Sequence, residues 1–293
     1  MVVDGALIQS SLFDASQMTM VFCRNFHRAP TKASGSNGKT TAAGGYRGGT
    51  RKGLDLTIGS GHITSPYFKN TIVDTPSSRL RGGILLRTLR RSSDSTVISG
   101  PSLLVDEILR LSKASRISEL VEQKWGRSTS AFPVVSTNGN SSPTSLYLRP
   151  KVSNEQDGKS VIYRSSRVGL DLSHPSTTES STDPRVIYIS KLYRYFIHPH
   201  LLTSNGRGHT FLGIYRSCLD SGQSDDHILR EIIRLSGLKE QKVVKYLADY
   251  NAGLQEGTLH SFVGSAGKGA SASPATYLKM MGTLARIGGD AAL

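Results

Sequence analysis

Apolar and polar residues alternate most clearly over residues 54–58, where polar residues separate three aliphatic side chains. This period of two predicts a strand with one buried face. Short runs rich in aliphatic, β-branched or aromatic residues predict further strands at 84–89, 161–163 and 185–190. We therefore expect these four segments to form a sheet.

A helical period replaces this alternation in three parts of the chain. Pro101, whose fixed φ suits the first turn of a helix, precedes a predicted helix over 102–112. A shorter helix is expected over 118–125, and in the C-terminal third Gly237 separates two more, the second over 239–250. The apolar face of the first helix is expected to consist of Leu104, Ile108 and Leu111.

The predicted strands and helices follow one another at irregular intervals and not as a repeating βαβ unit. This order predicts an α+β fold with a single curved mixed or antiparallel sheet, flanking helices and long polar loop insertions. The expected organisation is a poorly ordered segment over 1–45, in which residues 18–22 could add a strand, a core over 46–215 with insertions at 61–78 and 127–160, a helical hairpin over 216–260, and a flexible tail over 261–293.

The net charge of +14 over 293 residues indicates a polyanionic partner. Nucleic acid is favoured over a membrane, because no basic amphipathic helix or lipidation signal accompanies the charge and no apolar run approaches the roughly 20 residues that span a bilayer. The two cysteines show no metal-ligand spacing and suggest free thiols in a reducing compartment. We therefore expect an intracellular monomer that uses no metal and no cofactor.

Arginines are concentrated around the predicted strand at 84–89, with no acidic residue among them. The strand leads through a Ser-Gly-Pro turn to the predicted helix N-terminus, where free backbone N–H groups can bind a phosphate. A competing interpretation is a solvated strand end followed by a packed helix. The candidate nucleic-acid-binding residues are Arg79, Arg81, Arg90, Arg91, Ser99, Gly100 and Ser102.

One stretch resembles a known family. Leu-Leu-Arg-Thr-Leu at 85–89, followed by Ser-Gly-Pro-Ser-Leu at 99–103, resembles the "LLRAL … SGPSKL" core of the alkyladenine DNA glycosylases. Residues 167–170 and 192–196 are similar to that family's "RVGV … LRFYV" ending, although the two matches cover a minority of the chain. The resemblance implies a nuclear enzyme that hydrolyses the N-glycosidic bond of alkylated purines in duplex DNA during base-excision repair, without a cofactor.

The resemblance places Arg87 at the family's water-side arginine but supplies no general base. The family takes that base from a motif resembling "ETEAY", and no Glu precedes Glu107 in this chain. Asp55 is the N-terminal acid on the clearest strand and follows several cations, so it is the substitute candidate for orienting the attacking water. A solvent-facing strand acid is the competing interpretation. The candidate catalytic residues are therefore Asp55 and Arg87.

Three hypotheses follow. The chain is a divergent glycosylase, or a catalytically inactive basic nucleic-acid-binding protein on the same scaffold, or a regulatory protein that uses its C-terminal helix pair. The glycosylase comparison requires 84–89 and 185–190 to lie in one domain, and a carboxylate beside Arg87 in a basic groove lined by an aromatic ring.

Overall fold

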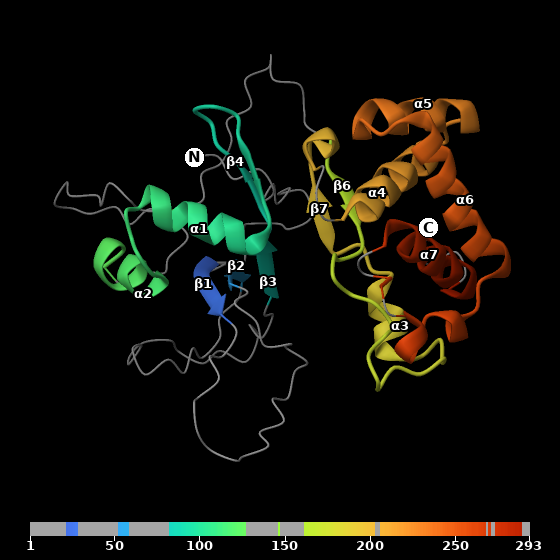
Figure 1. Cartoon of the computed structure of the whole chain (residues 1–293), viewed down its shortest axis with the longest axis horizontal. Coiled ribbons are helices and arrows are strands. Elements are labelled where there is room, and N and C mark those ends of the chain that lie inside the picture. Colours follow the sequence, from blue (N-terminus) through green and yellow to red (C-terminus); the bar gives the residue numbers. More distant parts are fainter. Residues whose placement is uncertain are drawn as a thin grey trace, which may run out of the picture. The chain divides into compact units, whose positions relative to one another are not determined.

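The computed structural model describes residues 22–28, 52–58, 82–126, 146, 161–202, 206–267, 269–270 and 273–288. The chain divides into two compact units, unit 1 over Met1–Asp157 and unit 2 over Gly158–Leu293 (Figure 1). Helices combine with small antiparallel sheets, which confirms the predicted α+β class.

Unit 1 contains a three-stranded antiparallel sheet in the order β1-β2-β3. Leu54 and Leu56 are buried, as the alternation in this strand predicts, and Leu54 pairs with Leu86 of the neighbouring strand. Part of the N-terminal segment predicted to be poorly ordered belongs to this sheet, since β1 pairs along its whole length with β2. The strands are β1 (Phe22–Arg28), β2 (Lys52–Ile58) and β3 (Gly82–Leu86).

A hairpin of β4 (Thr88–Arg90) and β5 (Val97–Ser99) follows and leads into α1 (Pro101–Leu111). Helix α1 packs on β2, and its buried aliphatic residues are Leu104, Val105, Ile108 and Leu109. Leu111 is exposed, so the predicted apolar face is wrong at its last position. The predicted helix at 118–125 is present as α2 (Ile117–Glu119) and the π-helical turn η2 (Leu120–Lys124), with Trp125 buried beside it.

Unit 2 is mainly helical and buries α4 at its centre, where Phe211, Leu212 and Ile214 are fully enclosed. The predicted helices around Gly237 are present as α5 and α6, and Gly237 ends α5 in the left-handed conformation with φ of 67°. The elements are β6 (Tyr163–Ser165), α3 (Pro184–Ile189), β7 (Arg194–Phe196), η3 (Pro199–Leu201), α4 (Arg207–Asp220), α5 (Asp225–Ser236), α6 (Glu240–Glu256), η4 (Leu259–Ser261), η5 (Gly264–Gly267) and α7 (Pro274–Gly288).

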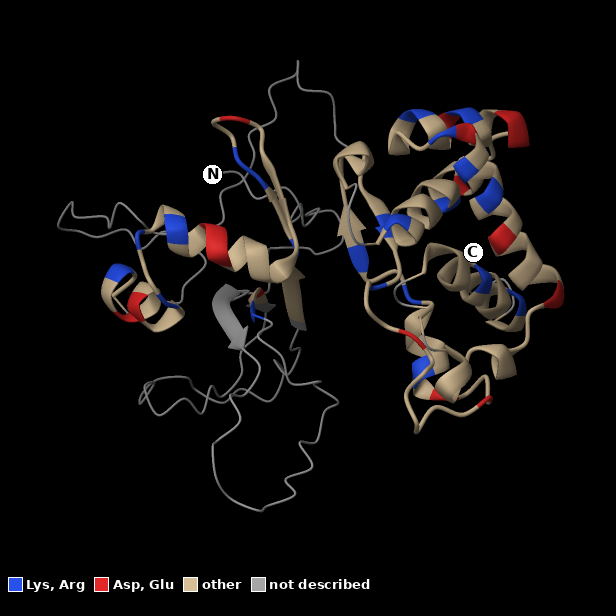
Figure 2. Ribbon diagram, viewed as in Figure 1, with Lys and Arg blue, Asp and Glu red and all other residues tan. Residues whose placement is uncertain are grey.

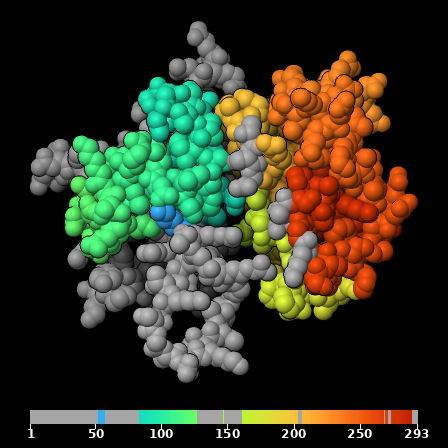
Figure 3. All heavy atoms as spheres, viewed as in Figure 1, coloured from blue at the N-terminus to red at the C-terminus, as the bar shows by residue number. Residues whose placement is uncertain are grey.

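Helix α7 belongs to the core of unit 2, although residues 261–293 are predicted to be a flexible tail. Its residues Leu278, Met280 and Met281 are fully buried. It packs along α6, and the two helices form a continuous surface in orange and red (Figure 3). At Gly253 and Gly282 the two backbones approach so closely that neither position has room for a Cβ atom.

The prediction of a single sheet is wrong. The described residues form three separate sheets, and the 157/158 boundary divides the expected core over 46–215. Residues 185–190 form most of helix α3 instead of a strand. The Asp183 side chain accepts a hydrogen bond of 2.8 Å from the Arg185 N–H, and Pro184 occupies the first helical position. This cap outweighs the β-branched and aromatic content on which the strand prediction depended.

Candidate nucleic-acid interface

The turn at Ser99–Ser102 joins α1 to the sheets of unit 1. Ser99 pairs with Thr88, and the Gly100 N–H donates to the Arg87 carbonyl oxygen at 2.8 Å. The Ser102 hydroxyl donates to the Lys52 carbonyl oxygen at 3.2 Å and accepts from the Lys52 N–H at 3.3 Å. These polar groups therefore hold α1 against β2, a structural role that the phosphate-binding prediction did not include.

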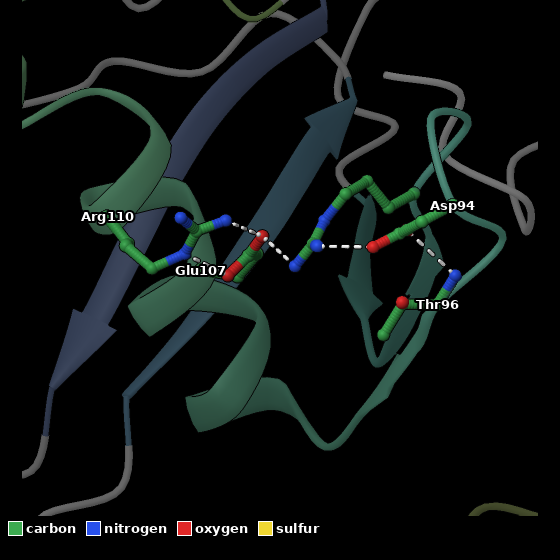
Figure 4. Close-up of polar contacts among 5 residues, drawn as sticks. Asp94, Thr96, Glu107 and Arg110 are labelled. Carbon is green, nitrogen blue, oxygen red and sulfur yellow. Dashed lines mark hydrogen bonds and ion pairs between the residues drawn. The ribbon is translucent and has the colours of Figure 1, made fainter.

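Arg91 belongs to a network of charged residues between the β4–β5 hairpin and α1, of which Asp94, Glu107 and Arg110 are labelled in Figure 4. Its guanidinium lies 2.7 Å from Asp94 and 2.7 Å from Glu107. Arg110 also donates to both oxygens of Glu107, at 2.8 and 2.7 Å. The two hydrogen bonds from Arg110, and to a smaller extent the one from Arg91, hold the pKa of the largely buried Glu107 carboxyl below its ordinary value.

This network changes the interpretation of the arginine cluster. Arg79 and Arg81 lie outside the described residues. Arg91 is neutralised by acids that the sequence places three and sixteen residues further along. Arg87 and Arg90 are half-buried, and each already interacts within the chain. The described part of the cluster therefore offers less free positive charge than its sequence indicates.

Replacing Glu107 with Gln is expected to lower the free energy of unfolding of unit 1 by about 2 kcal/mol, because two guanidinium groups lose their shared carboxylate. The folded-state pKa lies below the ordinary 4.5, so the carboxylate stabilises unit 1 above that pH and loses its effect as pH falls through the folded-state pKa. The variant should lack this part of the acid sensitivity. Urea unfolding at pH 7 and pH 4, followed by fluorescence of the buried Trp125, measures both effects. Exposed Glu122→Gln is the control, and equal midpoints for parent and Glu107→Gln would contradict the prediction.

The two candidate catalytic residues lie close together along the sheet. Asp55 pairs with Leu85, and Arg87 follows two residues later, directly after β3. Because side chains alternate, Asp55 and Leu85 share the face opposite buried Leu54 and Leu86, and continued alternation places Arg87 there as a diagonal neighbour of Asp55. Asp55 and Arg87 each interact within the chain.

Among the described side chains of unit 1, no aromatic ring lies at this place to form a base pocket. Where side chains of unit 1 are described, the aromatic side chain is Trp125, which is 5% exposed and packed in the core. The second family-like stretch, over 167–170 and 192–196, lies in unit 2, whereas the first lies in unit 1. The requirement that 84–89 and 185–190 share one domain is therefore not met.

In unit 2, the inner face of the antiparallel strand pair β6–β7 is fixed in the core. Tyr163 pairs with Phe196, and their rings stack with centroids 5.6 Å apart. Arg194 donates to the hydroxyls of Ser165 and Thr210 at 3.2 and 3.0 Å. Its guanidinium also lies 4.4 Å from the centroid of the Phe196 ring. Arg194 in the family-like stretch thus has a structural role.

The outer face of this strand pair is exposed, basic and aromatic. Arg164 pairs with Tyr195. Tyr193 directly precedes β7, and alternation continued back from the strand places it on the same side as Tyr195. Tyr195 is 56% and Tyr193 55% exposed. We call Arg164, Tyr193 and Tyr195 the tyrosine face. The exposed residues Arg167 and Lys191 are its flanking cations.

Among the described residues, the cations at this face have no counter-ions. Within the described part of the chain, Arg164, Arg167 and Lys191 make no side-chain hydrogen bond or ion pair. Residues 158–170 and 184–219 contain no Asp or Glu. The ribbon of β6 and β7 accordingly carries blue but no red in Figure 2. This group of residues is absent from the sequence-based candidates, although the alternation at 192–196 already places Tyr193 and Tyr195 on one side.

Comparison with known proteins assigns no family to this chain. No family model matches it, and no solved structure matches it. A stretch of 75 residues is 35% identical to an uncharacterized protein of Acanthamoeba polyphaga mimivirus. The stretch covers 26% of this chain, which thus spans about a third (33%) of the viral protein's length.

Two further observations concern membranes and metals. Among the described helices, none is both long and apolar enough to cross a bilayer. The described His, Cys, Asp and Glu side chains do not gather anywhere in a group of three or more that could hold a metal ion. His198 and His200 lie near each other, with ring centroids 6.0 Å apart, in and beside the short turn η3.

Proposed function

We propose that this protein binds nucleic acid through the tyrosine face and its flanking cations. The observation that carries the proposal is that exposed tyrosines lie on and beside one strand pair together with arginine and lysine side chains, and that these cations make no side-chain hydrogen bond or ion pair within the described residues. This is the non-catalytic hypothesis, with the contact in unit 2 and not at the arginine cluster of unit 1. Duplex DNA and a nuclear location, which the glycosylase resemblance implies, stay predictions.

The contrast between the two units supports this assignment. Arg91 already has two carboxylates as partners, and a phosphate would have to replace them at a cost in Coulomb energy. Arg164, in contrast, is exposed with no acid nearby in sequence, so a phosphate contact there releases condensed counter-ions without breaking an existing pair. Exposed cations of this kind contribute affinity that does not depend on base sequence.

Replacing Arg164, Arg167 and Lys191 together with Gln is expected to weaken binding and to reduce the slope of log K against log salt by about 2 to 3, since each lost phosphate contact removes about 0.7 to 0.9. Fluorescence anisotropy with labelled oligonucleotides over a series of salt concentrations measures the slope. The matched control replaces Arg230, Lys242 and Lys245 of α5 and α6 with Gln, because these side chains are also exposed cations of unit 2. An equal loss in the control would instead support the C-terminal helix pair as the contact surface.

A second candidate function is hydrolysis of an N-glycosidic bond by Asp55 with Arg87. The observation that favours it is the strand register, which supports a carboxylate and an arginine on the same face of the sheet. The distribution of the two family-like stretches over separate units counts against it. Base release from alkylated duplex DNA distinguishes this candidate from binding alone.

A further inference from the structure

The spacing of Tyr193 and Tyr195 carries an inference about the kind of nucleic acid. We infer that the tyrosine face is a stacking platform for unpaired bases, so that the ligand is a single-stranded nucleic acid; the inference rests on the proposed function. Tyr195 lies in β7 and Tyr193 directly precedes it. Extended backbone continued back to Tyr193 separates the two residues by about 7 Å, twice the roughly 3.4 Å rise of stacked bases. The two rings thus suit one or two successive bases that stack on or between them.

No contact among the described residues explains the exposure of the two rings. An aromatic side chain that is more than half exposed gives up most of the apolar area it could bury. Neither phenol hydroxyl makes a hydrogen bond within the described residues. Bases in a duplex are already stacked on both sides and expose only their edges in the grooves, so exposed rings gain contact area chiefly with unpaired bases.

The platform is held rigidly from below. The Tyr163 and Phe196 rings stack under the tyrosine face. Gly213 of α4 lets the helix approach the strand pair so closely that a Cβ at this position would lie 2.9 Å from the Arg164 carbonyl oxygen. Rings held on a rigid support lose little conformational entropy on binding. The tyrosine face is therefore pre-organised for stacking.

The cations lie where the backbone of a stacked strand would pass. Arg164 is directly opposite Tyr195, and such cross-strand neighbours have Cβ atoms about 4.5–5.5 Å apart. A base stacked on Tyr195 would have its phosphate within reach of the long Arg164 side chain, while the flanking cations Arg167 and Lys191 would contact neighbouring phosphates. Stacking and charge together match a short single strand.

The experiment measures binding of labelled 20-mers of dT, of rU, of a 20-base-pair duplex and of an abasic 20-mer, which keeps its phosphates but has no bases. We expect the parent to prefer dT or rU over the duplex and the abasic strand, and the two homopolymers show whether DNA or RNA is preferred. Tyr195→Ala should weaken dT and rU binding on the order of tenfold and leave abasic binding unchanged, whereas Tyr195→Phe should bind like the parent. Tyr188→Ala is the matched control, because Tyr188 is 57% exposed on α3 but lies outside the tyrosine face.

The outcomes separate the two claims. Equal binding of abasic and dT strands, or an unchanged affinity in Tyr195→Ala, overturns the stacking inference. The proposed function survives that result if the triple Gln variant still loses affinity. Failure of the parent to bind any of the four oligonucleotides overturns both claims.

Discussion

Replacing Gly253 with Ala is expected to destabilise unit 2 by at least about 3 kcal/mol, because overpacking typically costs 1–3 kcal/mol and here the clash involves backbone. A Cβ atom at position 253 of α6 would overlap the Lys279 carbonyl oxygen of α7. Backbone atoms cannot rotate away as a side chain can, so the two helices would have to separate. Their separation would also stretch the hydrogen bond of 3.3 Å from the Thr283 hydroxyl to the Gly253 carbonyl oxygen.

Two measurements in the full chain test this prediction. Hydrogen exchange over residues 240–288 reports on α6 and α7, and Trp125 fluorescence reports on unit 1, which should not change. The control is Asn251→Ala, since Asn251 is exposed in the same helix and Ala has the higher helix propensity. If Gly253→Ala kept the exchange protection of the parent, the close approach of α6 and α7 would be disproved.

Helices were predictable where both the period and the ends are local. Pro101 and the apolar residues that follow define α1 within about three turns, and Gly237 ends α5 through its own conformation. Helix α3 was not predicted, although the signals for its first residues are also local. The cap residues Asp183 and Pro184 and the β-branched run after them are both local signals in the sequence, and in the folded chain the cap outweighs the strand propensity of that run.

The arrangement of strands was not predictable in the same way. Alternation over 54–58 indicates that β2 has a buried face but does not identify the strands beside it. Strand pairing depends on segments distant in sequence, so three small sheets in two units and one continuous sheet are equally compatible with such runs. The α+β class was therefore predictable and the connectivity was not.

The candidate site shows the same limit for charges. The sequence around Arg91 contains a run of arginines. Only the fold shows that Glu107 lies close enough to Arg91 to neutralise its charge. Conversely, the alternation of Tyr193 with Arg194 and Tyr195 was visible, and only the fold shows which side of that strand is covered. Spacing predicts which residues share a face, and tertiary packing decides whether that face is free.

The second prediction concerns catalysis by Asp55. If the second candidate function holds, Asp55→Asn should lower the rate of base release from alkylated duplex DNA by about 10²- to 10⁴-fold, the typical loss when a general base is removed. The expected effect follows because the amide cannot accept a proton from the attacking water, although it has nearly the same shape. Binding should persist, because the proposed contact surface of unit 2 is unaltered.

The control and the outcomes decide between the two functions. Glu122→Gln removes an exposed carboxylate elsewhere in unit 1 and should release base at the parent rate. A parent that binds DNA but releases no base above background supports the non-catalytic proposal, because the strand register alone then does not make a site. Equal release by the parent and Asp55→Asn would preserve an enzyme but remove Asp55 from its mechanism. Since Asp55 already interacts within the chain, its replacement must also leave Trp125 fluorescence unchanged before a lost rate is assigned to chemistry.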